Sequence, residues 1–587
     1  MVTVQAADAT NDGAMTYVDH ENVEGPARRI LLSAGFLGTA SVLAFIGIWQ
    51  LVGLRYSYVV SDPSAVYHAF FKIFSRDMVP AFGRTSQGLG IGFGLCIVFG
   101  VPFGILIGRS RLLALILEPY AAMLFSLPFI ALFPVLILVE GINLTFRVTC
   151  IILAGIFPII INTARGVRAV NSDFLDVGRS LVAGRLRTIT TIVFPGSIRY
   201  IFAGIRVGFA RAMIGTVVVE LEAAPSGVGY IMHQFTEQFL YAEYFAVVIV
   251  LGFYALLITN VIGRVENWAL HPWERHRSLQ RLHNAAPLVA RDTFDTGATV
   301  TGTLTVAARI GRIFAPLARW STRTSAVVSP LLRRSWVAWI VRLLTLMAIL
   351  GAWNWKAHES SAAVLSTPGA VGKSLWQLLV THRQMWAPIG LSFEVLTVGF
   401  LVSLLVGFPL GILMGRSRIA EKLLDPYVKF LYALPHAVFI PIMVEWLGFQ
   451  FKFAVAYVFV SAVFPVMINT ISGVKGTDPD LIDTGISFTA SERKIRSSIV
   501  IPAAFPMMLT GARLAFSASW VGVIIAEILT TNTGLGGDIQ LYSDEFQTPA
   551  MYAAIVAIMF IAVILLQLSV RLERKLTPWA PRKTIEG

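Results

Sequence analysis

Long apolar segments recur along the chain, and most are long enough to cross a bilayer, because a spanning helix needs about 20 apolar residues. They lack the strict alternation over about ten residues that a transmembrane β-strand shows. The pattern predicts an all-α polytopic membrane protein built from two sets of six helices, or about 12 transmembrane helices. The segments lie near residues 30–53, 86–108, 114–139, 147–164, 200–221 and 243–263, and near 336–354, 391–415, 422–446, 453–471, 507–529 and 549–570.

Polar composition divides the rest of the chain. An acidic tail, residues 1–27, is expected to be a disordered cytoplasmic segment. It precedes a first membrane domain, 28–273, and a second one, 336–579, with a short cytoplasmic tail at 580–587. Between the domains, residues 274–335 carry ten arginines and a Thr- and Gly-rich middle, which predicts a basic cytoplasmic linker.

Charge sharpens this picture. Hydrophobic residues make up 56% of the 587 residues and charged residues only 14%, against roughly 25% in soluble domains. A soluble enzyme is therefore excluded. The formal charge of +13 is concentrated in the linker and in loops on one side, while the loops at 221–242 and 528–548 contain no Lys or Arg. The positive-inside rule places both termini in the cytoplasm, and nothing indicates a nucleic-acid partner.

The two halves are copies of each other. At an offset of 307 residues, Gly100–Arg111 (GVPFGILIGRSR) matches Gly407–Arg418 (GFPLGILMGRSR). The same offset pairs prolines, glycines and charged residues without a gap from about 100 to 229, which low-complexity apolar sequence would not do by accident. Six spans in each half give both halves the same orientation, so the repeat is parallel and its axis lies along the membrane normal.

One inner loop in each half carries a duplicated polar pattern of acidic, small and then basic residues, closed by a proline. Acidic residues suit the start of a helix, and the proline marks the start of the next span. The pattern predicts a short helix lying beneath the membrane and parallel to it. Its residues are Asp176, Gly178, Arg179, Arg185, Arg187 and Pro195 in the first half, and Asp483, Gly485, Arg493, Lys494 and Pro502 in the second.

This loop resembles the cytoplasmic loop of bacterial ABC importer permeases, whose pattern is Glu-Ala-Ala, three residues, Gly, nine residues, Ile-x-Leu-Pro. The spacing from Asp176 to Ile192 and Pro195, and from Asp483 to Ile499 and Pro502, is met in both halves. Asp replaces the Glu in both halves, and the central Gly is replaced by Val182 and Thr489. The segment Asp176–Leu181 (DVGRSL) resembles the nitrate/sulfonate/taurine branch, with two permease domains fused in one chain.

The resemblance implies a permease subunit of an ATP-driven importer in the bacterial inner membrane. Two ABC ATPase subunits and an extracytoplasmic substrate-binding protein are the implied partners. ATP and Mg would be bound by the ATPase subunits, and no cofactor is expected in this chain. The resemblance makes each loop helix a coupling helix that docks on an ATPase. Its basic residues are docking charges in one interpretation and topology markers in the other.

Three pairs of residues are candidates for the substrate path: Glu220 with Glu527, Asn162 with Asn469, and Pro128 with Pro435. Intramembrane carboxylates are functional by default, but these two could instead accept backbone hydrogen bonds and cap the glycine turn that follows. The asparagines could line the path or serve helix packing and capping. The prolines should break or kink the third spans, which is tolerated where broken backbone faces protein or a cavity.

Other chemistry is not indicated. No Walker-type phosphate loop, metal-spaced histidine pair or nucleophile–base arrangement is present in the sequence, so neither intrinsic enzymatic activity nor a metal site is expected. The alternative is an ion-coupled secondary transporter built from parallel six-helix repeats. The solute stays open between nitrate, sulfonates, taurine, bicarbonate and vitamin precursors.

Overall fold

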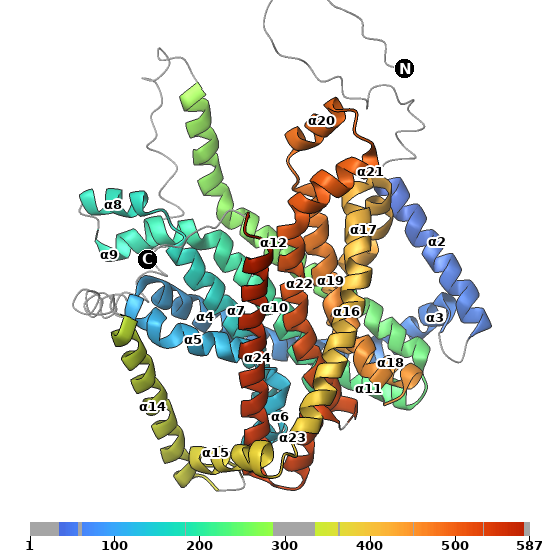
Figure 1. The fold of residues 1–587 in the computed structure, drawn as a ribbon. Coiled ribbons are helices and arrows are strands. Elements are labelled where there is room, and N and C mark those ends of the chain that lie inside the picture. Colours follow the sequence, from blue (N-terminus) through green and yellow to red (C-terminus); the bar gives the residue numbers. More distant parts are fainter. Residues whose placement is uncertain are drawn as a thin grey trace, which may run out of the picture.

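The computed structural model describes residues 34–56, 61–181, 184–285, 335–361, 364–449, 451–531 and 533–579. Helices joined by short turns make up these residues, which contain no β-strand (Figure 1). The predicted all-α polytopic architecture is confirmed. The tails at 1–27 and 580–587 lie outside the described residues, as does most of the predicted linker.

The first half follows one path from the first span to the long sixth helix. Its elements are α2 (Ala34–Arg55), α3 (Pro63–Ile73), η2 (Phe74–Met78), α4 (Val79–Arg109), α5 (Arg111–Ser126), η3 (Phe129–Leu132), α6 (Phe133–Glu140), α7 (Leu144–Arg168), α8 (Ser172–Ser180), α9 (Arg185–Thr188), η4 (Ile189–Val193), α10 (Phe194–Glu222), α11 (Val228–Glu237) and α12 (Tyr241–Ala285).

The second half repeats this order almost element for element. Its elements are α14 (Ser335–Glu359), α15 (Pro368–Trp376), η7 (Gln377–Thr381), α16 (Trp386–Arg416), α17 (Arg418–Ala433), η8 (His436–Phe439), α18 (Ile440–Leu447), α19 (Phe451–Lys475), α20 (Pro479–Ser487), α21 (Glu492–Ile495), η9 (Arg496–Val500), α22 (Ile501–Ala526), η10 (Glu527–Thr531), α23 (Gly534–Asp544) and α24 (Thr548–Leu576).

Within the described residues, 9 helices are long and apolar enough to cross a membrane, and up to 11 spans result if each bent pair of helices counts as one. Helix α14 occupies the place of the remaining expected span but is not among these candidates. Helix α12 continues to Ala285 and so passes through the linker boundary expected at residue 274.

The third span of each half is broken, as its prolines predict. Helix α5 ends at Ser126 and the chain turns at Pro128, where it bends by 92° into α6. In the second half α17 ends at Ala433 and turns at Pro435, with a bend of 93° into α18. Proline removes a backbone donor and restricts the residue before it, so a helix ends at this point.

A seam of glycines holds the core of each half together, between α4 and α7 and between α16 and α19. A Cβ on Gly104 would lie 2.5 Å from Cβ of Thr163, and one on Gly411 would lie 2.6 Å from Cβ of Thr470. Small residues let membrane helices approach closely, which is the main source of packing energy where lipid replaces water. These two contacts are related by the repeat offset, so both halves use the same seam.

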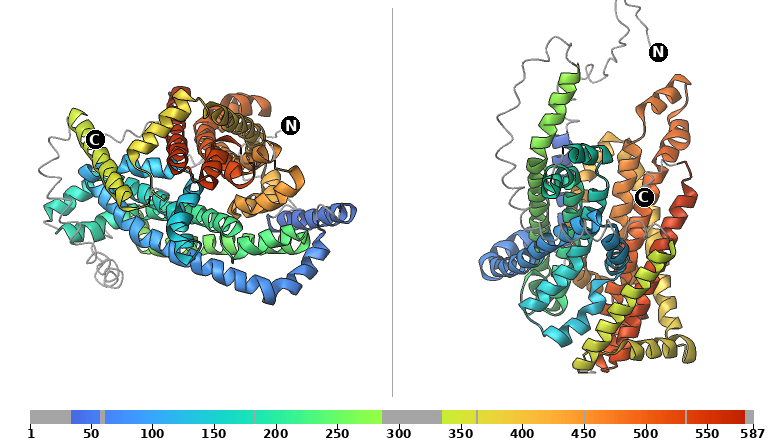
Figure 2. Two further views of the ribbon diagram at one scale, coloured as in Figure 1. Left: turned by 90° about the horizontal axis from the view of Figure 1, so that it is seen from below. Right: turned by 90° about the vertical axis from the view of Figure 1, so that its left-hand side faces the viewer.

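The halves lie side by side and exchange their first helices (Figure 2). Helix α2 of the first half packs on α17 of the second, and α14 packs on α5. The hydroxyl of Ser41 on α2 donates to the carbonyl of Leu423 at 2.9 Å, and Tyr120 on α5 donates to the carbonyl of Arg342 on α14 at 3.4 Å. Further inward, α10 packs on η8 and α22 packs on η3.

We expect Gly104→Val to weaken the seam, because the added methyl groups meet Thr163 and the carbonyl of Ile160 within 2.8 Å. Overpacking of this kind costs about 1–3 kcal/mol of unfolding free energy. Gly94→Val is the matched control on the same helix, since nothing lies within 4 Å of that position. Thermal unfolding in detergent should show a loss for Gly104→Val alone, and equal losses for both variants would contradict the seam.

Candidate functional site

Each inner loop folds as a helical hairpin, which we call the first hairpin (α8, α9 and η4) and the second hairpin (α20, α21 and η9). Asp478 begins the second hairpin as an N-cap, with its carboxylate accepting from the Asp480 amide at 3.0 Å. Ser491 caps the returning helix. The short helices expected in both loops are present, and Pro195 and Pro502 lie in the first turn of α10 and α22.

One contact fixes both hairpins. A Cβ on Gly178 would lie 2.9 Å from Cδ1 of Ile192, and one on Gly485 would lie 2.7 Å from Cδ1 of Ile499. In both halves the isoleucine stands fourteen positions after the glycine. This spacing is the length of chain that leaves the first helix, turns and brings the isoleucine back to the glycine. A side chain in place of either glycine would require the isoleucine to move at this contact.

Thr489 ends the helix of the second hairpin in a left-handed conformation, with φ of +52°. The Ala490 amide donates to the carbonyl of Gly485 and the Thr489 amide to that of Ile486. This pair of bonds is the Schellman helix end, in which the left-handed residue is usually glycine. Thr489, which stands where the family pattern has glycine, therefore adopts the left-handed conformation itself, at the cost of backbone strain. Its counterpart Val182 lies outside the described residues.

Large apolar side chains stand exposed on both hairpins. We call Phe174, Val177 and Leu181, with Leu481 and Phe488, the docking face. Leu181 is 75% exposed and Phe488, its partner at the repeat offset, is 80% exposed. Positions seven apart on a helix lie on one side of it, so each hairpin presents an apolar ridge. Both ridges lie on loops that connect spans, outside the packed helices.

The basic residues predicted in the loops lie on the same two hairpins. Arg187, Arg493 and Lys494 are exposed. The side chains of Arg179 and Arg185 lie outside the description, although their backbones belong to α8 and α9. Asp176 is exposed and Asp483 is half-buried, and their carbonyls accept hydrogen bonds from Ser180 and Ser487 at 3.0 and 2.9 Å.

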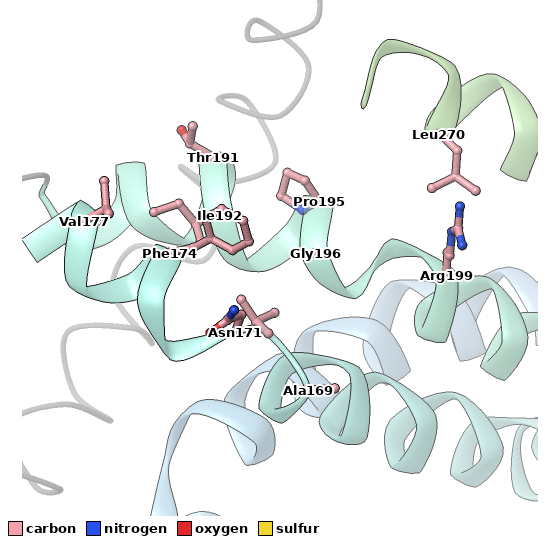
Figure 3. Close-up of a pocket in the computed structure, with 11 residues that line it drawn as sticks. Ala169, Asn171, Phe174, Val177, Thr191, Ile192, Pro195, Gly196, Arg199 and Leu270 are labelled. Atoms are coloured by element: carbon pink, nitrogen blue, oxygen red, sulfur yellow. The ribbon is translucent and has the colours of Figure 1, made fainter. Parts of the chain in front are cut away.

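A hollow of about 540 Å³ lies under the first hairpin, between α8, η4, α10 and the inner part of α12 (Figure 3). Phe174, Val177 and Ile192 line the end nearest the hairpin, and Arg199 and Leu270 line the opposite end. The lining is mostly apolar. The second hairpin differs, because Ile495, Val500 and Met508 pack beneath it as a small apolar core.

Glu220 is enclosed near the C-terminal end of α10 and has 0% exposure. Thr85 donates its hydroxyl to both carboxylate oxygens at 2.9 and 2.8 Å, and the Gly229 amide donates at 3.1 Å. The guanidinium of Arg147 forms an ion pair with it. The turn between Glu220 and α11 needs Gly227, whose φ is +119° and whose Cβ, if present, would overlap the carboxylate.

Glu527 makes the equivalent contacts in the second half. Ser392 donates to it at 2.6 Å and the Gly536 amide at 2.9 Å. The cation is missing from this second site, because Ala454 stands at the position that corresponds to Arg147. Among the described residues Glu527 has no cation partner, although it is only 2% exposed. For both carboxylates these contacts favour the turn-capping interpretation over contact with substrate.

Sequence reasoning missed Thr85, Ser392 and Arg147. The first two could have been found, since they are polar residues inside apolar spans and pair with each other at the repeat offset. Arg147 lies within a predicted span and is only 7% exposed. An isolated arginine in an apolar segment signals a buried acidic partner, but the repeat offered no second example.

The other path candidates lie in helix contacts. Asn162 donates to the carbonyl of Pro158 and Asn469 to that of Pro465, both at 2.9 Å. A Cβ on Gly204 of α10 would lie 3.0 Å from Cβ of Asn162, so this side chain packs between α7 and α10. These contacts fit the packing and capping alternative. Pro128 and Pro435 lie at the helix breaks between the halves.

Comparison with known proteins also finds two matching regions in the chain, one in each half. The family described as the binding-protein-dependent transport system inner membrane component matches residues 100–268 and 407–578, more than half of the chain. The chain belongs to this family. It is therefore a multi-pass ABC transporter permease of the inner membrane.

Individual relatives match the permease one half at a time. The putative aliphatic sulfonates transport permease protein of Bacillus subtilis is 29% identical over 42% of this chain and 90% of its own length. The taurine transport system permease protein of Escherichia coli is 30% identical over 33% of this chain and 71% of its own. The nitrate import permease protein of Leptolyngbya laminosa is 26% identical over 42% and 87%.

We expect Arg147→Ala to cost about 3–5 kcal/mol of unfolding free energy, because it leaves a buried carboxylate without its cation. Adding Glu220→Gln to the same chain removes the unpaired acid and should recover most of that loss. Unfolding in detergent, measured for both single variants and the double variant, checks this. If the double variant loses as much as the two single variants together, the pair is not coupled.

Thr489→Gly should stabilise the second hairpin by about 1 kcal/mol, because glycine adopts the left-handed conformation without strain. Hydrogen exchange of the Ala490 amide, which bonds to Gly485, should then slow by about fivefold. Thr484→Gly is the control within the helix of the same hairpin, where glycine should instead speed exchange. Faster exchange in Thr489→Gly would contradict a strained helix end.

Proposed function

We propose that this chain supplies two permease domains of an ATP-driven importer. The importer moves a small solute from an extracytoplasmic binding protein into the cytoplasm. The docking face carries the proposal. Exposed phenylalanine and leucine side chains on two loops outside the membrane are costly in water, and apolar patches of this kind mark protein interfaces. Two equivalent faces fit two copies of one partner, which we take to be an ABC ATPase subunit.

The basic residues of the hairpins also fit a protein partner. Arg187, Arg493 and Lys494 are exposed on the same hairpins as the apolar ridges, so each hairpin offers both exposed apolar side chains and exposed basic charge. Interfaces between proteins commonly combine the two, since apolar contacts supply affinity and charges supply orientation. ATP and Mg would be held by the ATPase subunits.

A rigid connection is needed for the hairpins to transmit motion. In the second half Gly485 packs on Ile499, and Ile495 and Val500 pack on Met508 of α22. Helix α22 in turn packs on η3 of the first half, at the helix break. Closure of two ATPase subunits would therefore move both halves through packed helices, biasing the permease between two arrangements.

The family and the names of its relatives guide the choice of solute. Nitrate and sulfonates are anions, and taurine carries a sulfonate group. We infer a small anionic solute, with both termini of the permease in the cytoplasm. The secondary-transporter alternative finds no support, because the matched family consists of binding-protein-dependent transport components.

The test replaces the apolar ridge with charge. Leu181→Asp with Phe488→Asp should abolish co-purification of the ATPase subunits and ATP-dependent uptake, because a carboxylate would be buried in an apolar interface. Thermal stability should be unchanged, since both side chains are exposed. Leu181→Met with Phe488→Leu is the matched control and should keep both activities.

Normal assembly and uptake in the Asp variant would show that the docking face is not where the ATPase binds. Uptake that continues in wild-type proteoliposomes lacking any ATPase subunit would overturn the importer proposal itself. Both arms use the full chain with its cognate binding protein, so a failed interface and a failed function give different results.

A further inference from the structure

The two halves touch at the level of their helix breaks, and they do so twice. Helix α10 of the first half packs on η8 of the second, and α22 of the second half packs on η3 of the first. The repeat makes these two contacts equivalent. Both lie where the third spans bend by 92° and 93°, so they border the boundary along which the halves move against each other.

One of these contacts carries an arginine. Arg211 lies eleven residues before the outer end of α10, about 16 Å from that end at 1.5 Å per residue and about 25 Å from the inner end. It is therefore deep in the membrane. Its guanidinium donates to the carbonyl of Phe125 at 3.1 Å, and its Cζ stands 4.1 Å from the centre of the Phe125 ring.

The opposite side of this contact carries a histidine. His436 is the first residue of η8, directly after the Pro435 break, and η8 is the element on which α10 with Arg211 packs. Its ring is 5.4 Å from the ring of Tyr457. Tyr457 has 0% exposure, and its hydroxyl has no hydrogen-bond partner among the described residues.

The equivalent contact in the other direction is apolar. At the repeat offset, Ala518 is the counterpart of Arg211, and Phe129 is the counterpart of His436. The same fold is therefore built once with an alanine and a phenylalanine and once with two basic side chains. Because the apolar version packs without charge, the contact between the two elements does not itself require an arginine and a histidine at these positions.

Two other membrane arginines have acidic partners, whereas Arg211 has none among the residues that the structure describes. Arg206 pairs with Glu266, and its repeat counterpart Arg513 pairs with Glu573 at 2.8 Å. Among the described residues Arg211 has only the Phe125 carbonyl and ring. A charge deep in a bilayer is expensive to keep. The Phe125 carbonyl takes up only one of the five N–H donors of the guanidinium, so the charge and its other donors suit an anion.

We propose that Arg211 and His436 form the anion contact of the translocation path, and that its ligand is a small singly charged oxyanion such as nitrate or the sulfonate group of an organic solute. The inference rests on the proposed import function and narrows its substrate class. A planar guanidinium matches two oxygens of such a group. The Phe125 carbonyl, at the negative end of α5, holds the guanidinium in place.

The arrangement favours release of the anion over tight binding. One arginine and one histidine, contributed by different halves, meet only while the halves are close at the breaks. When the halves separate, the contact opens and the anion loses one of its two partners. Weak or divided binding is what allows a transported ion to leave again.

The first experiment measures binding in nanodiscs that contain the permease with its ATPase subunits. At equal ionic strength, sodium nitrate and sodium methanesulfonate should raise the melting temperature of the wild type above its value in sodium chloride. Arg211→Gln should abolish this shift. Arg206→Gln with Glu266→Gln, which removes an arginine from the same helix together with its partner, should keep it. No shift in the wild type, or an equal shift in Arg211→Gln, overturns the proposal.

The second experiment measures uptake of labelled nitrate or taurine by proteoliposomes that contain the full transporter and its binding protein. Arg211→Gln should lower uptake by about 10- to 100-fold, the loss of one charge-assisted hydrogen-bonding group, while ATP hydrolysis stimulated by the loaded binding protein persists. His436→Phe, which copies Phe129, should lower uptake less. Wild-type uptake in Arg211→Gln overturns the anion contact but leaves ATP-driven import standing.

Discussion

Backbone groups freed inside a membrane must find partners within the protein, and this constraint organises the contact between the halves. The chain breaks at Pro128 and at Pro435, where helical bonding stops. The carbonyl of Phe125 beside the first break receives a hydrogen bond from Arg211 of α10. The carbonyl of Val438 beside the second receives one from Tyr244 of the opposite half. The breaks are thus covered by protein, as irregular backbone at membrane depth requires.

A duplicated frame has acquired unequal chemistry at a few positions. The glycine seams, the hairpin contacts and the capped turns at Glu220 and Glu527 are the same in both halves. The differences concern charge, because Arg147 faces Glu220 while Ala454 stands in its place in the second half. Fusion of two domains in one chain makes such differences possible, since each half can change without changing the other.

The sequence alone predicted what depends on repetition and on local chemistry. The offset of 307, the broken third spans and the hairpin helices all follow from prolines, glycines and apolar runs that occur twice. Arg147 and Arg211 have no basic counterpart at the repeat offset. Their roles were missed because each depends on a partner that is distant in the sequence. The strained turn at Thr489 could not be predicted either. The sequence shows that the family glycine is missing, but it does not show which backbone conformation Thr489 adopts.

The central claim is that closure of the ATPase subunits reaches the membrane through the two hairpins, and a distance between them tests it most directly. Ser180 and Ser487 are exposed equivalents beside the docking face, and the native Cys96 and Cys150 are buried. Nitroxide labels on Ser180→Cys and Ser487→Cys in the assembled transporter should report a shorter distance when ATP is bound and hydrolysis is blocked. The same distance with and without ATP, in a transporter that still imports, would contradict the account.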